Sequence, residues 1–392
     1  MRENIFEINL FKSILDLFLI IRGFFMKNIF SKSIVSAVFF FCLIAGSSFS
    51  FAQTKKTIAV FSPGDKSNVF WTDMINFSKS VADKLQMNIV VYYGDDDADI
   101  MAKNMETAAK LASKPDGFIF PSMTGQGDRY IKIAEKHAIP SIFVNIGLDK
   151  NVTVSSTRSY NSFCLGQVTP DDENAGYELA KTLIMTAKSA GKKSINILAI
   201  AAQENDVNAV LRVKGLEKAL KEFPDVILSR IANTDWSKEQ TLEALEAEAD
   251  LNRITIVWAA SDDMALTASS YFKTKGLNQG KDVFIGGIDW TNKALQAVKS
   301  GELTTSVGGH FADMGWAMIL FYDYFNGKDF ASENTIFKSA MKPLIAKNVN
   351  IFLSSEGKDR WSDVNFRSFS KVLNPSLKEY RFDLVVLLRM AK

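Results

Sequence analysis

The sequence is short of the residues that most enzyme and nucleic-acid sites require. Its 392 residues include only two histidines, His137 and His310, and two cysteines, Cys42 and Cys164. It has no Cys-x-x-Cys, no His-Glu-x-x-His and no Gly-x-Ser-x-Gly, which are patterns of zinc and serine-hydrolase sites. A formal net charge of +2 provides no basic stripe for phosphate groups. These absences argue against an enzyme, a metal or cofactor site, and a nucleic-acid partner.

Two further patterns fall short of known sites. Gly125-Gln-Gly127 lacks the third glycine of a dinucleotide-binding loop. The acidic run Asp95 to Asp97, followed by Asp99, lacks the glycine and the bidentate glutamate of a calcium loop. We therefore interpret this run as a solvated turn before a helix.

The amino-terminal region has the features of an export signal. From Met26 onward a basic segment with Lys27 leads into the apolar run Ile34 to Ala45, and a small-residue cleavage site ends at Ala52. About a dozen apolar residues are fewer than the roughly 20 that span a bilayer. We therefore expect residues 1–52 to be a signal peptide region with its true start at Met26, and the mature protein to be periplasmic. Cys164 alone would remain, so no internal disulfide is expected.

The rest of the chain alternates short apolar runs with amphipathic stretches. Without residues 1–52 it has 340 residues, more than one hydrophobic core usually serves, so two domains are expected. Continuous apolar runs are typical of parallel strands covered by helices on both faces. The predicted strands are Thr57 to Phe61, Asn88 to Tyr93, Gly117 to Phe120, Pro140 to Asn145, Ser194 to Ala201, Val226 to Ile231, Ile254 to Ala259 and Val283 to Gly287. The sequence predicts an α/β protein of two doubly wound parallel-sheet lobes.

A candidate binding group follows the first predicted strand. Asn68, Phe70 and Trp71 lie where open α/β sheets bind small ligands, beyond the carboxyl ends of their strands. A sugar has a C–H face that stacks on aromatic rings and hydroxyls that need polar partners. The alternative is that Asn68 only caps the next helix and that the two rings belong to the core. The residues alone do not separate these interpretations.

Six motifs follow one another between Thr57 and about Lys347. They are Asn68-Val-Phe-Trp71, Ile139-Pro-Ser-Ile-Phe-Val-Asn145, Pro170-Asp-Asp-Glu-Asn-Ala-Gly176, Leu211-Arg-Val-Lys-Gly215, Ala260-Ser-Asp-Asp-Met-Ala-Leu266 and Gly286-Gly-Ile-Asp289. Their order and spacing resemble those of the type 1 periplasmic binding proteins of the ribose and galactose type, which share their fold with the autoinducer-2 receptors. The resemblance implies two α/β lobes joined by a three-segment hinge.

The resemblance also implies a set of ligand contacts. Phe70, Trp71 and Trp236 fall on ring-stacking positions, and Arg212 falls on a guanidinium position able to bridge two oxygens. Asp289 matches the carboxylate that accepts hydroxyl protons, and Asn145 matches an amide. Each has a plain structural alternative: core or loop packing for Trp236, a solvated helix residue for Arg212, and a helix N-cap for Asp289.

Three departures from the family pattern leave the exact ligand open. Asn145-Ile146 replaces an Asp-Arg pair, and Ser261 replaces an asparagine. Gly308-Gly309-His310 stands where a polar or basic residue usually lies. His310 has three open roles: a ligand contact, a pH-sensitive latch, or a hinge residue beside flexible glycines.

The family's fold implies crossovers near Pro170, Gly309 and Lys342. The first lobe would comprise residues 53–170 and 310–341, and the second lobe residues 171–309 and 342–392 with the C-terminal tail. The expected function is to trap a sugar or polyol between the lobes and to present the closed state to a membrane partner. That partner is an ABC-importer permease or, alternatively, a sensor kinase or chemoreceptor. A monomer is expected.

Overall fold

The computed structural model describes residues 55–148, 157–353, 361, 363–384 and 386. The predicted signal peptide lies outside these residues. Among the described residues, no helix combines the length and the apolar character needed to cross a membrane.

The first lobe contains a sheet of six parallel strands. Its strands lie in the order β11-β5-β4-β3-β1-β2. The elements of this lobe are β1 (Thr57–Ser62), α3 (Val69–Lys84), β2 (Asn88–Tyr93), α4 (Ala98–Ala109), β3 (Gly117–Phe120), α5 (Met123–Lys136), β4 (Ser141–Val144), α6 (Thr157–Tyr160), β5 (Cys164–Pro170), η2 (His310–Ala312), α12 (Asp313–Phe325), η3 (Phe330–Ser332) and β11 (Ile336–Ser339).

Helices cover both faces of this sheet, as the continuous apolar strands predict. Along β1, Ile58 and Val60 enter one core cluster and Ala59 and Phe61 enter another, because successive side chains of a strand point to opposite faces. Residues of α3 and α12 join the first cluster, and residues of α4 and α5 join the second. A parallel sheet needs this double cover, since neither of its faces is polar.

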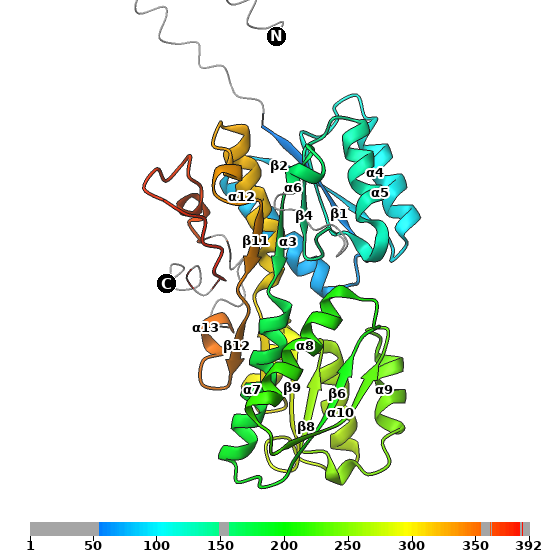
Figure 1. Ribbon diagram of the computed structural model, residues 1–392. Coiled ribbons are helices and arrows are strands. Elements are labelled where there is room, and N and C mark those ends of the chain that lie inside the picture. Colours follow the sequence, from blue (N-terminus) through cyan, green and yellow to red (C-terminus); the bar gives the residue numbers. More distant parts are fainter. Residues whose placement is uncertain (1–54, 149–156, 354–360, 362, 385, 387–392) are drawn as a thin grey trace, which may run out of the picture. The chain divides into compact units, whose positions relative to one another are not determined.

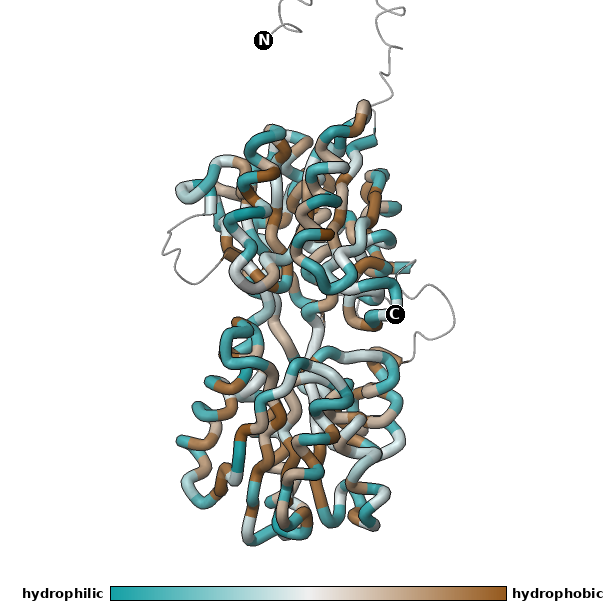
Figure 2. The backbone as a smooth tube through the Cα atoms, turned by 90° about the vertical axis from the view of Figure 1, so that its right-hand side faces the viewer, coloured by the Kyte–Doolittle hydropathy of each residue, from teal (hydrophilic) through white to brown (hydrophobic). Residues whose placement is uncertain are grey.

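The second lobe repeats this arrangement with one antiparallel edge strand. Its sheet has the order β12-β10-β9-β8-β6-β7, and only β12 runs antiparallel, beside β10. The remaining elements are α7 (Asp172–Ser189), β6 (Ile195–Ala201), α8 (Val207–Glu222), β7 (Val226–Asn233), α9 (Lys238–Glu246), η1 (Leu251–Arg253), β8 (Ile256–Ala259), α10 (Asp262–Thr274), β9 (Phe284–Asp289), α11 (Asn292–Ser300), β10 (Thr305–Gly308), β12 (Lys342–Ile345), α13 (Asn350–Leu353) and η4 (Phe366–Phe369). In Figure 1, α7, α8, β6, β8 and β9 of this lobe run from green to yellow. Figure 2 shows brown, hydrophobic residues along its interior strands.

The two sheets confirm the predicted fold class. Within the described residues, three segments join a strand of one sheet to the other lobe: β5 leads into α7 after Pro170, β10 leads into α12 through Gly309, and β11 leads directly into β12. The first and third segments touch, because the Asp171 backbone N–H donates to the Ser339 carbonyl oxygen (3.2 Å). Gly309 has a φ of 125°, a value that favours glycine, so a side chain there would strain the second crossover.

The C-terminal tail differs from the expected grouping. We expected residues 342–392 to lie with the second lobe. Lys342–Ile345 does pair with β10 of that lobe, but Lys371 and Tyr380 both hydrogen-bond to Asp323 of α12, and Phe382 stacks on Trp316 of the same helix. The reason is physical: α12 is apolar around nearly its whole circumference, so the face turned away from the sheet also needs a cover.

The acidic turn at Asp95 to Asp97 has the local role that the sequence indicated. Asp97 caps α4 and accepts hydrogen bonds from the backbone N–H groups of Asp99 (2.7 Å) and Ile100 (3.1 Å). Asp95 and Asp96 have φ values of 51° and 58°, a conformation that aspartate adopts in turns more readily than most residues.

Candidate functional site

Arg212 is the centre of a buried polar cluster on α8. It is 3% exposed, so it is not the solvated helix residue that was its alternative interpretation. Two glycines bring α8 close to α7: a Cβ on Gly176 would lie 1.9 Å from the Arg212 carbonyl oxygen, and one on Gly215 would lie 2.0 Å from the Glu173 carbonyl oxygen. Because these backbones touch, Arg212 lies directly beside the first turn of α7.

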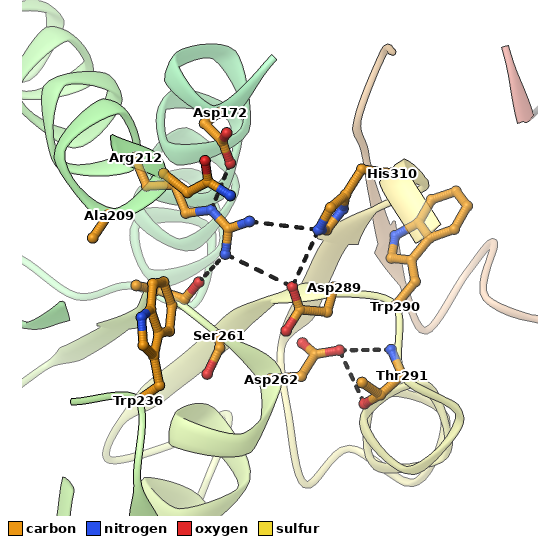
Figure 3. A network of polar contacts seen from close by, with 12 residues as sticks. Asp172, Ala209, Arg212, Trp236, Ser261, Asp262, Asp289, Trp290, Thr291 and His310 are labelled. Atoms are coloured by element: carbon orange, nitrogen blue, oxygen red, sulfur yellow. Dashed lines mark hydrogen bonds and ion pairs between the residues drawn. The ribbon is translucent and has the colours of Figure 1, made fainter. Parts of the chain in front are cut away.

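The guanidinium of Arg212 contacts four groups. Its Nε donates to Asp172 Oδ1 (2.7 Å), and one terminal nitrogen donates to the Ala260 carbonyl oxygen (2.6 Å). The same terminal nitrogen lies 3.7 Å from Asp289 Oδ1, and the other lies 3.5 Å from His310 Nε2. Figure 3 shows Arg212 between Trp236 on one side and Asp289 and His310 on the other. Arginine can only donate, so each neighbour acts as an acceptor.

The Arg212–Asp172 contact is a buried ion pair, with side chains 4% and 2% exposed. Burial opposes the charge on Arg212, but the carboxylates of Asp172 and Asp289 raise its pKa. Burial likewise raises the pKa of Asp172, and Arg212 offsets part of that rise. The 2.7 Å distance is typical of a charge-assisted hydrogen bond, and we therefore treat the pair as ionised at neutral pH.

Asp289 lies at the carboxyl end of β9 in a strained backbone. Its φ is 145°, and the φ of the next residue, Trp290, is 61°, which is costly for non-glycine residues. The N-cap of α11 is Thr291, so Asp289 does not have the capping role that was its alternative. Burial, offset in part by Arg212, raises the pKa of Asp289 to about 7. This carboxyl can therefore accept or donate a hydrogen bond near neutral pH.

His310 lies at the second crossover and is 1% exposed. Burial and the neighbouring Arg212 lower its pKa to about 3, so the ring is neutral at physiological pH. Its 3.5 Å contact with Asp289 is thus not an ion pair. The ring of Phe70 from the first lobe lies against it, with centroids 4.8 Å apart at 32°. His310 is therefore at the hinge and next to the polar cluster at once.

Trp236 covers the other side of the guanidinium. The Arg212 guanidinium carbon lies 5.7 Å from the centroid of its ring, within the range of a cation–π contact. The indole Nε1 donates to Asp206 Oδ2 (3.3 Å), and its backbone φ of 71° turns the loop after β7. The indole is partly exposed and also packs against the core cluster.

The group after β1 divides between two roles. Asn68 is the N-cap of α3 and accepts a hydrogen bond from the Trp71 backbone N–H (3.2 Å). Trp71 is 9% exposed and joins the first-lobe core, whereas Phe70 is only partly buried. The two rings meet edge to face, with centroids 5.3 Å apart. Of the three, Phe70 reaches the Arg212 cluster, through His310.

Two further predicted residues lie at strand ends. Asn145 follows β4 with a φ of 62°, and its Oδ1 accepts a hydrogen bond from Asn208 Nδ2 on α8 (3.2 Å), which links the first lobe to the second. Ser261 follows β8 and is the N-cap of α10, where it accepts from the Met264 backbone N–H (3.3 Å). The structure thus brings Phe70, Arg212, Trp236, Asp289 and His310 together, with Asn68, Trp71 and Ser261 in capping or packing roles.

Comparison with known proteins gives the family. Residues 58–329 match the model of the periplasmic binding protein domain. The chain belongs to the periplasmic binding protein family. It is 27% identical over 237 residues to the galactofuranose-binding protein YtfQ of Escherichia coli. The aligned region covers 59% of this chain and 70% of that protein. It is also 27% identical over 275 residues to catabolite control protein A of Priestia megaterium, covering 69% and 75%.

The solved structures agree on the fold of this periplasmic binding protein. A periplasmic sugar-binding protein from Pseudomonas fluorescens superimposes with a TM-score of 0.75 at 24% identity, covering 85% of this chain and all of that chain. The similar proteins thus include both binding proteins and a regulator. The family match ends at residue 329, so the tail after β12 lies outside it.

Sequence reasoning about this periplasmic binding protein missed Asp172, Asn208 and Asp262. Asp172 pairs with Arg212, and Asn208 pairs with Asn145. Asp262 is fully buried and accepts hydrogen bonds from the Thr291 backbone N–H (2.8 Å) and from Ser306 Oγ (2.7 Å). Asn208, one helical turn before Arg212 on the same face of α8, had a detectable signal.

A cavity of about 250 Å³ lies apart from the Arg212 cluster. Its lining residues are Asp73, Asn76, Trp290, Asn292, Phe311, Phe352 and Trp361, none of which belongs to the predicted site. In Figure 3 the Trp290 ring lies beyond His310, on the side away from Arg212 and Trp236. We assign the candidate site to the Arg212 cluster because its polar groups and its aromatic face converge there.

Proposed function

We propose that this protein is an extracytoplasmic solute-binding protein that traps a sugar or sugar-like molecule between its lobes and delivers it to an ABC importer. The observation that carries the proposal is the convergence of Arg212, Trp236 and Asp289 from three separate elements beside Phe70 of the other lobe. Such a site lies at the carboxyl ends of the strands, where open α/β sheets bind ligands.

The charges of the cluster favour an uncharged ligand. The positive charge of Arg212 is balanced by Asp172 at 2.7 Å. His310 is neutral, and Asp289 has a pKa of about 7, so it carries only part of a negative charge at neutral pH. A ligand with several hydroxyls can donate to Asp289 and accept from Arg212, and its C–H face can stack on Trp236.

Contacts between the lobes support trapping by closure. Asn145 of the first lobe accepts a hydrogen bond from Asn208 of the second lobe, and Phe70 of the first lobe touches His310 at the second crossover, so both lobes contribute groups beside the cluster. A ligand that contacts both lobes stabilises the closed arrangement by its extra affinity for that arrangement. We place the lobe boundaries at the three crossovers near Pro170, Gly309 and Lys342, and the mature protein in the periplasm, where an importer's permease would receive it.

The test is a thermal-shift screen of the processed protein against pentoses, hexoses, their furanose forms and polyols. The furanose forms are included because one relative binds galactofuranose. A ligand at 100 times its dissociation constant adds about 2.7 kcal/mol of stability. We expect one or more of these compounds to raise the melting temperature, and native mass spectrometry to find the same compound in purified protein. No shift across the panel would contradict the proposal.

Variants then test the site with a matched control. Trp236→Ala removes the aromatic face and Arg212→Lys removes the planar fork, so each should abolish most of the ligand-dependent shift. Tyr271→Ala removes another partly buried aromatic ring from the same lobe, on α10, where it lies near Lys275. This control should keep the shift. Equal binding by all three variants would exclude the cluster as the binding site.

A further inference from the structure

The C-terminal strap, defined as residues 350–353, 361 and 363–384, is anchored to the first lobe. Asp323 of α12 is fully buried and accepts hydrogen bonds from the Ser370 hydroxyl, from the Lys371 backbone N–H (2.6 Å) and from the Tyr380 hydroxyl (2.7 Å). Trp316 of the same helix packs against Phe369 and Phe382 of the strap, with ring centroids 5.2 and 5.1 Å apart. One carboxylate and one indole thus fix the far half of the strap.

The near part of the strap reaches the second lobe. Trp361 meets Phe77 of α3 edge to face at 4.9 Å, and it lies 5.8 Å from Phe311 at the second crossover. Phe352 lies 5.9 Å from Phe311 and 5.5 Å from Trp290 of the second lobe. A series of rings therefore runs from a first-lobe helix, across the crossover, to the residue that follows Asp289.

A pocket of about 250 Å³ borders this seam. It lies among Trp290, Phe311, Phe352 and Trp361, with Asp73 of α3 and Asn292 of α11 on its walls. Asn76 and Asn292 on its wall are exposed, so the pocket opens to solvent. Phe352 and Trp290 therefore have open space on one side, beside the ring of Trp361.

We propose that the C-terminal strap is an intramolecular brace that sets the opening between the two lobes. The far half of the strap is fixed on α12, and its Trp361 meets Phe352, with ring centroids 6.2 Å apart. Phe352 in turn contacts Trp290 of the second lobe. The strap thereby stabilises the lobe arrangement in which these rings make more contacts, relative to an arrangement in which they make fewer. Loosening that contact redistributes the lobe arrangements of the ligand-free protein, and through Trp290 it also frees the strained backbone at Asp289.

A plain structural role is the competing explanation: the strap would only complete the first-lobe core. The two explanations separate at Phe352 and Phe382. Both are buried strap phenylalanines, 4% and 7% exposed, but Phe352 touches the second lobe whereas Phe382 contacts Trp316, Phe337 and Tyr380. A core role predicts the same kind of effect from both, while a brace predicts an effect on lobe spacing from Phe352 alone.

The experiment measures lobe spacing in the ligand-free, processed protein, so it is independent of the proposed function. Spin labels at K103C on α4 and K214C on α8, both exposed positions, report the distance by pulsed dipolar EPR, and Cys164 is fully buried. We expect Phe352→Ala to shift or broaden the distance distribution. Phe382→Ala should lower the melting temperature but leave the distribution unchanged.

Two outcomes would overturn the brace. One is a Phe352→Ala distribution identical to that of the parent, and the other is an equal change from Phe382→Ala. If Phe352→Ala does not fold, Phe352→Leu removes the ring while keeping much of the volume, and the same comparison applies. A Phe352→Leu distribution that matches the parent would likewise refute the proposal.

Discussion

The buried Arg212–Asp172 pair allows a sharp test of how the candidate site is built. We expect Asp172→Asn to destabilise the protein, because it leaves the Arg212 guanidinium buried without its closest negative charge. The side chains are 4% and 2% exposed, so water cannot replace the lost carboxylate. Removing one partner of a buried pair typically costs about 3–5 kcal/mol. Asparagine keeps an acceptor for Nε, which places the expected loss near the lower end, at about 3 kcal/mol.

Other groups around Arg212 cannot fully compensate for that change. The Ala260 carbonyl oxygen at 2.6 Å supplies a hydrogen bond but no charge. Asp289 is 3.7 Å away, and burial raises its pKa to about 7 in the native protein, so it is only partly ionised at neutral pH. In the variant the unpaired guanidinium should lower the pKa of Asp289 and hold it ionised, which recovers part of the lost charge pairing.

The matched control is Glu173→Gln, one residue further along α7. Glu173 lies 3.9 Å from Lys218, with side chains 45% and 58% exposed, and exposed pairs of this kind are worth less than about 1 kcal/mol. Urea unfolding followed by both tryptophan fluorescence and circular dichroism measures the two losses and checks that the transitions coincide. If Asp172→Asn loses no more stability than Glu173→Gln, the argument that the pair holds Arg212 in place fails.

Two further predictions concern packing and pH. Gly176→Ala should lower the free energy of unfolding by about 1–3 kcal/mol or more, because the new Cβ would overlap the α8 backbone. Gly191→Ala has open space around the new Cβ but a φ of 86°, so it should lower that free energy by only about 1 kcal/mol. Thermal unfolding of the two variants measures the difference. The Asp289 carboxyl has a folded pKa of about 7, above its ordinary 3.8, so its contribution to stability is fully present below pH 3.8 and is lost as the pH rises through 7. Melting temperatures of Asp289→Asn should therefore fall less between pH 5 and 8 than those of the parent, and equal slopes would contradict this assignment.

The strands that the sequence predicted are those with continuous apolar runs. Asn88 to Tyr93 and Gly117 to Phe120 were predicted with the bounds that the structure has. The strand Cys164–Pro170 was missed because its Gly166 and Gln167 interrupt the apolar pattern. The edge strand Lys342–Ile345 was missed because it pairs only with β10 and has only four residues, too few to show a clear hydrophobic pattern in the sequence. Local pattern therefore finds strands with continuous apolar runs, such as the edge strand β2, and misses short or interrupted strands, such as the interior strand β5.

The candidate site shows a similar limit. Arg212 and Trp236 could be named because the family resemblance gave each a role, whereas Asp172 stood only within the Pro170–Gly176 motif and was given none. In the structure it lies in the first turn of α7, where acidic residues are common. Its burial depends on the contact between Gly176 and α8, which joins residues 40 apart along the chain. A contact of that kind has no local periodicity. The backbone at Asp289 and Trp290 also gave no sequence signal, since neither residue type usually adopts positive φ.

The features around Arg212 are costly for stability, and their location is therefore informative. A buried ion pair is often no better than apolar residues of the same volume. Each non-glycine residue at positive φ costs on the order of 1–3 kcal/mol, and Asp289 and Trp290 are consecutive. His310 Nδ1 is buried and has no hydrogen-bond partner among the described residues. A fold selected only for stability would replace these groups. Their concentration at one set of strand ends, beside the crossovers, is what the proposed binding site would require.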